Sequence, residues 1–243
     1  IQYGILSGKI DSLCSLPFAL NVAFITTLVP NISKSMARRN FEEVREKAQK
    51  YILISILIAL PIASTMFIYP GEIIKILFPN APSGEMYLKI SSITIIFMLT
   101  AQTINGILQG IGKVNIPGIS FGVGMIIKFL CNIFLIQNEK IGIYGAIIGN
   151  ILCNIVACAI SSVVLLKTIN MKINLKNTII KPILATICMN IVSIFLYSKL
   201  KCIKSSFWAI IVTLMVSYLI YLILIVVLKI YPIKKIKIKN FPK

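Results

Sequence analysis

The chain has 243 residues, of which 58% are hydrophobic and only 13% are charged, whereas a soluble domain has about a quarter of its residues charged. This composition cannot cover a water-exposed surface and excludes an ordinary soluble domain. The formal net charge of +18 does not indicate nucleic-acid binding, because lysine and arginine lie mostly between long apolar runs and do not form a basic cluster on a soluble domain.

Seven apolar stretches of about 20 residues follow one another along the chain, each long enough to cross a bilayer core about 30 Å thick. The sequence therefore predicts an all-α, polytopic membrane helix bundle. The predicted spans are residues 8–31, 51–70, 87–110, 116–136, 142–166, 178–198 and 207–229.

Lysine and arginine gather on one side when successive connections are assigned to alternate faces of the membrane. That side holds residues 32–50, Lys113, residues 167–181 and the tail 231–243. Because cytoplasmic connections are enriched in these residues, this side and the basic C-terminal tail are expected in the cytoplasm. The N-terminal end is then outside without a signal peptide, so we expect an upstream helix and a missing N-terminal half of the same protein.

The first connection has a helix-start signal of its own. We expect the first span to be kinked near Pro17 and to end at Pro30. Asn40 is a good N-cap, with Glu43 three residues later in a capping-box arrangement. A short amphipathic helix near 34–50 on the membrane surface, close to anionic headgroups, is one interpretation; a solvated connector is the other.

Polar residues inside the spans are the candidates for chemistry, because such groups are costly in lipid and usually face a bundle interior or a cavity. An ammonium at the bilayer centre costs about 3 kcal/mol or more, so Lys128 should meet an anionic partner or water. Interhelical hydrogen bonding is the alternative for the amides. The candidate cavity residues are Lys128, Asn132, Asn105, Gln109, Asn21 and Asp11, with Asn150 and Asn154 forming a further i,i+4 pair.

Signatures of catalysis are missing from the sequence. The chain has no histidine, no closely spaced acidic pair within the predicted bundle, and no G-x-S-x-G motif. The stretch GILQGIGKV lacks the glycine and the Ser or Thr of a phosphate loop, because Ile107 and Val114 stand there. We therefore expect no enzyme activity, metal or cofactor. Asp11 is the one acidic candidate for binding a cation or proton.

Four glycine pairs have the GxxxG spacing that lets membrane helices approach closely. They are Gly4/Gly8, Gly106/Gly110, Gly118/Gly122 and Gly145/Gly149. We expect all four to lie at tight helix contacts.

Several motifs, in order from Tyr3 to Lys167, resemble one group of membrane proteins. They are YGILSGKIDSLCSLPFALNVAFITTLVPNIS, ILQGIGKVNIP, IIKFLCNIFLI and IGIYGAIIGNILCN. These stretches are similar to the C-terminal half of the polysaccharide-export and stage V sporulation protein B group, within the multidrug/oligosaccharidyl-lipid/polysaccharide flippase superfamily.

The resemblance implies an architecture of about fourteen spans in two lobes around a central cavity. Residues 1–167 would be part of the second lobe, 168–230 two additional C-terminal helices, and 231–243 the tail. Related lipid II flippases carry an arginine shortly before the LP motif, where this chain has Ser12, so the exact substrate stays open. The residues that match the family motifs are Pro17, Pro30, Ser33, Gln109, Gly110, Gly112, Lys113, Lys128 and Asn132.

The function implied is a cell-membrane flippase for lipid-linked oligosaccharide or polysaccharide, serving cell-wall or spore-cortex synthesis by alternating access. Its partners would be the lipid-linked glycan and membrane lipids, with no nucleic acid. Two alternatives stay open: a cation-coupled multidrug exporter of the same superfamily, which would need Asp11, and a membrane scaffold that does not transport.

Overall fold

The computed structural model describes residues 2–137, 141–171, 175–201, 206–228 and 230. Every regular element in these ranges is a helix. The chain forms two compact units, residues 1–174 and 175–243. The last helix of the first unit, α7, ends at Ile169.

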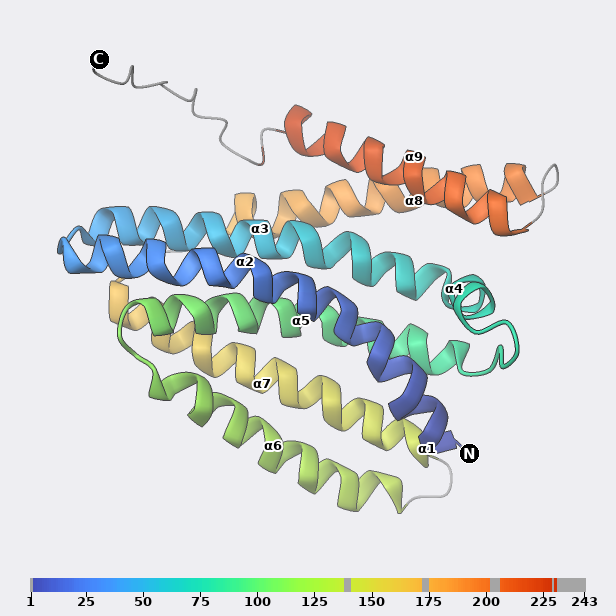
Figure 1. Cartoon of the computed structure of the whole chain (residues 1–243), viewed down its shortest axis with the longest axis horizontal. Coiled ribbons are helices and arrows are strands. Elements are labelled where there is room, and N and C mark those ends of the chain that lie inside the picture. The colour runs from blue at the N-terminus through green and yellow to red at the C-terminus, as the bar shows by residue number, and fades with distance from the viewer. Residues whose placement is uncertain (1, 138–140, 172–174, 202–205, 229, 231–243) are drawn as a thin grey trace. The chain divides into compact units, whose positions relative to one another are not determined.

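Among the described residues, seven helices are long and apolar enough to cross a membrane, which confirms the seven predicted spans. The five of them that belong to the first unit lie side by side (Figure 1). The seven helices are η1–α2 (Leu6–Ala37), α3 (Phe41–Ile68), α5 (Glu85–Gly110), α6 (Asn115–Ile136), α7 (Ile143–Ile169), η2–α8 (Lys176–Lys201) and α9 (Ser206–Val227). The short elements are α1 (Gln2–Ile5), the π-helical turns η1 (Leu6–Ile10) and η2 (Lys176–Ile180), and α4 (Pro70–Leu77).

The helix α2 (Asp11–Ala37) contains both Pro17 and Pro30, so the prediction that the first span ends at Pro30 is wrong. A proline removes one backbone hydrogen bond, which tertiary packing can offset. Leu28 and Ile32, on either side of Pro30, are completely buried in the core. The helix ends instead where Arg39 adopts a left-handed backbone conformation, with φ of 54°.

The start of α3 confirms the predicted cap and corrects the predicted surface helix. The Asn40 side chain accepts a hydrogen bond from the backbone N–H of Glu43 at 3.1 Å. Residues 41–50 are not a separate helix, however, because α3 continues without a break to Ile68. Val44 and Ala48 are completely buried in the same core cluster as Ile32, so this face packs on protein instead of lying on lipid.

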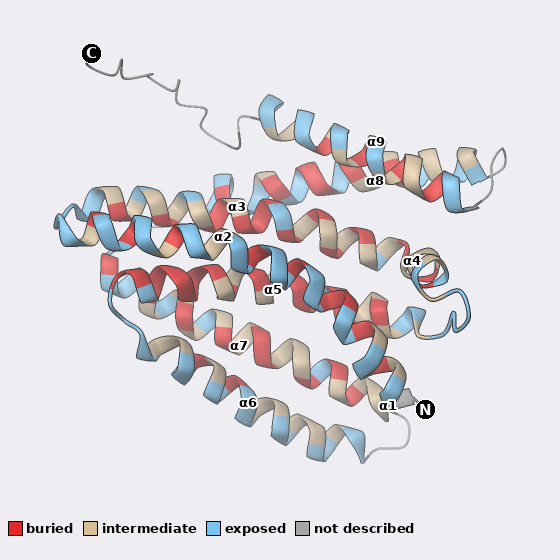
Figure 2. Cartoon of the chain, viewed as in Figure 1, coloured by how far each residue is buried: buried red, intermediate tan, exposed pale blue. Residues whose placement is uncertain are grey.

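The helix α5 is the centre of the first unit. It contacts α2, α3, α6 and α7, and 61% of its most apolar stretch is buried, more than in any other described span. Figure 2 shows its surface mostly red, the colour of buried residues. Two core clusters lie along it, one around Leu28 and Ile107 and the other around Leu88 and Leu99. The position of α5 therefore sets the spacing of the helices around it.

Two of the four glycine pairs lie at tight contacts, as predicted. A Cβ on Gly110 would stand 2.8 Å from the Ile32 side chain of α2, and one on Gly106 3.0 Å from Ile25. Gly145 and Gly149 face α6 in the same way, with a Cβ on Gly145 only 2.7 Å from Leu135. The prediction is wrong for Gly4/Gly8 and Gly118/Gly122, which meet no described atom within 4 Å.

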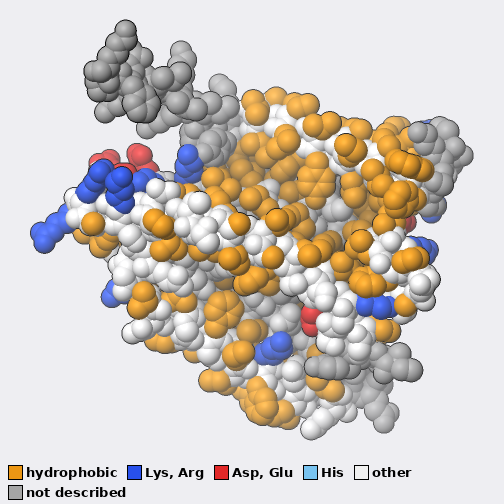
Figure 3. Space-filling view, viewed as in Figure 1, with side chains coloured by type: hydrophobic (Ala, Val, Ile, Leu, Met, Phe, Trp, Pro, Cys, Tyr) orange, Lys and Arg blue, Asp and Glu red, His pale blue; other side chains and the backbone are white. Residues whose placement is uncertain are grey.

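Lysine and arginine are most numerous at one end of the first unit, called here the basic end. It comprises the C-terminal ends of α2, α5 and α7 and the N-terminal ends of α3 and α6. Figure 3 shows Lys and Arg side chains gathered there, while hydrophobic side chains cover much of the flank. Arg45 Nε donates to the Ile169 carbonyl at 2.6 Å, and Lys47 Nζ donates to Ser35 Oγ at 2.7 Å. These two basic residues therefore join α3 to the ends of α7 and α2.

The second unit is an antiparallel pair of helices, α8 (Lys181–Lys201) and α9, which pack against each other. Ala185 and Met189 of α8 and Ala209 and Ile210 of α9 are buried. Lys181 Nζ, at the start of α8, donates to the Leu228 carbonyl, just beyond α9, at 3.2 Å. The predicted basic tail, 231–243, lies outside the described residues.

Candidate functional site

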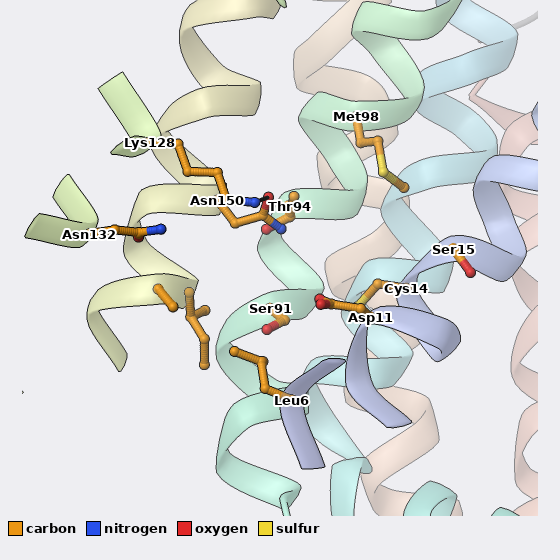
Figure 4. A pocket seen from close by; sticks show the side chains of 12 residues that line it. Leu6, Asp11, Cys14, Ser15, Ser91, Thr94, Met98, Lys128, Asn132 and Asn150 are labelled. Carbon is orange, nitrogen blue, oxygen red and sulfur yellow. Dashed lines mark hydrogen bonds between the residues drawn. The ribbon is translucent and has the colours of Figure 1, made fainter. Parts of the chain in front are cut away.

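A pocket with a volume of about 290 Å³ lies in the first unit, in the half away from the basic end. We call it the polar pocket. Four helical segments supply its walls, and Figure 4 shows their side chains converging. Its lining residues are Leu6, Asp11, Cys14 and Ser15 from η1–α2, Ser91, Thr94 and Met98 from α5, Lys128 and Asn132 from α6, and Ala146, Ile147 and Asn150 from α7.

Lys128 lies on the α6 wall and reaches across to α7. Its Nζ donates a hydrogen bond to Asn150 Oδ1 at 3.2 Å. The close approach that this bond needs depends on glycine, because a Cβ on Gly149 would stand 2.9 Å from Asn132 Oδ1, and one on Gly124 2.8 Å from the Cys153 carbonyl. No carboxylate in the described part of the chain lies within ion-pair distance of Lys128. The ammonium therefore faces the pocket with a neutral partner.

Asp11 brings the opposite charge to the same pocket. It follows the π-helical turn η1, in which its backbone N–H bonds to the Leu6 carbonyl, five residues back. Such turns are rare in proteins overall, but those that occur are often found at functional sites. The Asp11 side chain is exposed and lies at the pocket in Figure 4. Within the described ranges it has no hydrogen-bond partner.

Two further lining residues have buried polar atoms without a partner. Thr94 is only 3% exposed, and its Oγ1 makes no hydrogen bond to any described group. Asn132 Oδ1 is likewise buried and unpartnered. A buried polar atom left unpaired costs about 1–3 kcal/mol, so these two atoms favour a ligand or water in the pocket.

The sequence profile of the MatE family matches residues 9–134, which is more than half of the chain. The chain belongs to the MatE family. The matched segment includes three of the four walls of the polar pocket, with Asp11, Thr94 and Lys128. MatE membership and seven apolar helices identify a multi-pass membrane protein of a transporter superfamily.

Curated relatives of this MatE chain come from Bacillus subtilis strain 168. The uncharacterized membrane protein YabM is 28% identical over 129 residues, which is 53% of this chain and 23% of YabM. Stage V sporulation protein B is 21% identical over 190 residues (77% and 36%), and lipid II flippase MurJ is 24% identical over 192 residues (75% and 34%). The chain spans about a quarter to a third of the length of these relatives. No solved structure matches it significantly.

These matches confirm the resemblance to the flippase superfamily that the motifs indicated. Of the predicted candidates, the structure of this MatE chain brings Asp11, Lys128 and Asn132 together in one pocket. Their function in binding stays a prediction.

The other three candidates lie outside the pocket. The Asn21 amide donates to Gln102 Oε1 at 2.8 Å and to the Leu99 carbonyl at 3.2 Å, which joins α2 to α5. Gln109 is exposed at the basic end of α5. Asn105 is buried and accepts a hydrogen bond from Ser161 Oγ at 2.7 Å. Asn21 and Asn105 thus act as interhelical hydrogen-bonding groups, the alternative that the sequence left open.

The polar pocket residues that were not predicted as part of the site include Asn150, Ser15, Ser91 and Thr94. The i,i+4 pairing of Asn150 with Asn154 was visible in the sequence, and in the structure Asn154 Nδ2 donates to the Asn150 carbonyl at 2.9 Å. Nothing in the sequence, however, indicated that Asn150 meets Lys128. Serine and threonine are common in membrane helices, so Ser91 and Thr94 gave no signal.

A buried triad of polar side chains closes the half of the bundle nearer the basic end. Ser161 Oγ of α7 bonds to Asn105 of α5 and to Ser120 Oγ of α6, the latter at 2.9 Å. We expect Ser161→Ala to destabilise the protein by about 1 kcal/mol, because it leaves Asn105 Oδ1 unpaired.

Thermal unfolding in detergent measures this loss of stability. Ser162→Ala is the matched control, because the neighbouring Ser162 hydroxyl bonds only within α7, to the Cys158 backbone carbonyl. Equal melting temperatures for the two variants would contradict a stabilising triad.

Proposed function

We propose that this chain forms the substrate-binding lobe of a flippase that moves a lipid-linked saccharide phosphate across the cell membrane. The observation that carries the proposal is the Lys128 ammonium, which faces a polar pocket inside an apolar bundle with only Asn150 as a partner. A partly buried cation with unused donors favours an anionic group, and phosphate oxygens accept such hydrogen bonds strongly.

The remaining walls suit the polar part of such a head group. Ser91 and Thr94 supply hydroxyls, and Asn132 supplies an unpartnered carbonyl oxygen. These groups can exchange hydrogen bonds with sugar hydroxyls. The volume of about 290 Å³ lies at the small end for ligand pockets, which favours one sugar and its phosphate over a longer glycan.

The packing of the first unit supports alternating access. The half near the basic end is closed by the Ser161 triad and by Ser33 Oγ, which donates to the Gly110 carbonyl at 3.0 Å. The polar pocket lies in the other half. If the basic end faces the cytoplasm, as its charge suggests, this conformation presents the pocket toward the outside. Release on the opposite side then requires the closed contacts to separate.

The named functions of two relatives, lipid II flippase and a sporulation protein, agree with cell-wall or spore-cortex synthesis as the setting. Asp11 favours a second candidate, a cation-coupled exporter of the same superfamily, because its carboxylate lies free at the pocket.

A transport assay separates the two. We expect the full-length protein, reconstituted in vesicles, to carry radiolabelled undecaprenyl pyrophosphate-linked sugar across the bilayer, as measured by access of external periodate to the sugar. Absence of lipid movement, with sodium- or proton-dependent efflux of a cationic dye in its place, would assign the exporter function.

A further inference from the structure

The polar pocket holds two opposite charges that are not joined by an ion pair in the described structure. The carboxylate of Asp11 comes from α2 and the ammonium of Lys128 from α6, and no ion pair joins them in the described structure. In Figure 4, Lys128 and Asp11 reach toward the pocket from different helices, with Thr94 of α5 near the end of the Lys128 side chain and Ser91 near Asp11 in that view. The charges of the two charged lining residues therefore sum to zero. Each of these two charged groups, called here a pole of the pocket, stays accessible to a ligand.

Each pole also keeps unused bonding capacity. An ammonium has three donors, of which Lys128 spends one on Asn150. A carboxylate can accept about four hydrogen bonds, and Asp11 accepts none from a described group. The unpartnered hydroxyl of Thr94 adds a further polar atom to the α5 wall. A ligand that fills the pocket can thus satisfy a negative and a positive site at once.

A ligand with one kind of charge would satisfy only half of this arrangement. An anion bound to Lys128 leaves the Asp11 carboxylate unpaired and repels it. A cation bound to Asp11 leaves the Lys128 ammonium unpaired and repels it in the same way. Both states are costly inside a membrane protein. A ligand that carries both charges meets no such penalty.

We propose that the pocket selects a zwitterionic head group, whose phosphate binds Lys128 and whose ammonium binds Asp11. This inference rests on the proposed function. The substrate class is then a lipid-linked phosphosugar that bears a free amine. Asp11 is the residue that determines specificity, because it separates this head group from the same group with a blocked amine.

This selection can be tested with two lipids that differ only in their amino group. They are undecaprenyl pyrophosphate-glucosamine and the same lipid with the amine acetylated, which removes the positive charge. We expect the full-length wild-type protein in vesicles to transport the free-amine lipid about tenfold faster or more, the effect of one charge-assisted hydrogen bond. Signals are normalised to detergent-opened vesicles, so that differences in periodate reactivity cancel.

The variant Asp11→Asn, nearly isosteric, should lose this preference while still transporting the acetylated lipid. The matched control is Glu42→Gln, which removes an exposed carboxylate at the other end of the bundle and should retain the preference. The wild-type comparison needs no substitution, so it holds even if Asp11→Asn fails to fold.

The outcomes distinguish this inference from the proposed function. Equal transport of both lipids by the wild type, or faster transport of the acetylated lipid, overturns the zwitterion inference and leaves the flippase in place. A preference that persists in Asp11→Asn also overturns it, since Asp11 is then not the selecting group. Transport of neither lipid overturns the proposed function itself.

Discussion

Replacing Lys128 by glutamine lowers transport of undecaprenyl pyrophosphate-linked sugar by about 10- to 100-fold. The variant keeps a side chain that can bond to Asn150 but loses the positive charge. Hydrogen bonds to a charged group contribute about 1.5–3 kcal/mol, which corresponds to that range of rates at limiting substrate. Initial rates of lipid movement into reconstituted vesicles, at equal amounts of protein, measure the effect.

Lys89→Gln is the control for this experiment. Lys89 lies near the start of α5, with its Nζ 5.1 Å from the centre of the Phe67 ring, and is not part of the pocket. The control removes the same charge and should retain the wild-type rate. If Lys128→Gln also transports at the wild-type rate, Lys128 does not bind the pyrophosphate.

Replacing Gly145 by valine destabilises the protein by about 3 kcal/mol and disrupts the polar pocket. A Cβ on Gly145 would stand 2.9 Å from the backbone carbonyl carbon of Leu135 and 3.0 Å from the backbone nitrogen of Ile136. Backbone atoms cannot move aside as a flexible side chain can, so α6 must shift away from α7. Overpacking of this kind costs about 1–3 kcal/mol, sometimes more, and the shift would separate Lys128 from Asn150.

Gly122→Val controls for the change in helix propensity, because both substitutions replace a helical glycine by the same residue. Gly122 meets no described atom within 4 Å, so its variant should melt within a few degrees of the wild type. Thermal unfolding in detergent and the transport assay measure the two effects. An equal loss of stability in both variants would show that propensity, and not the α6–α7 contact, is responsible.

The sequence was sufficient to predict the seven membrane spans, because the length and hydrophobicity of a span are set directly by the thickness of the membrane core. The cap at Asn40 was predictable for a similar reason, since it depends on residues three positions apart. The end of α2 was not predictable. Pro30 is a strong local stop signal, but burial of Leu28 and Ile32 in the core outweighs it. The short helix α4, within a predicted connection, was also missed.

The candidate site was predictable only where its residues share one helix. Lys128 and Asn132, which lie four residues apart on α6, were both predicted as cavity residues, and both line the polar pocket. Their meeting with Asp11 and Asn150 depends on how four helical segments pack, which local sequence does not determine. For the same reason the sequence could not decide whether Asn105 faces a cavity or a neighbouring helix, and in the structure it bonds to Ser161 in a closed contact.

The π-helical turn η1 (Leu6–Ile10) determines which residues of the first span face the polar pocket. In a regular α-helix, with 3.6 residues per turn, Leu6 and Asp11 would point in clearly different directions, yet both line the polar pocket. Deleting one residue from this turn would restore regular α-helical geometry, and Leu6 would then stand four residues before Asp11, on about the same face of the helix. The helix would still be long enough to cross the membrane. The π-helical turn therefore lets the first span hold one residue more than a regular α-helix would, while Leu6 and Asp11 both keep facing the polar pocket.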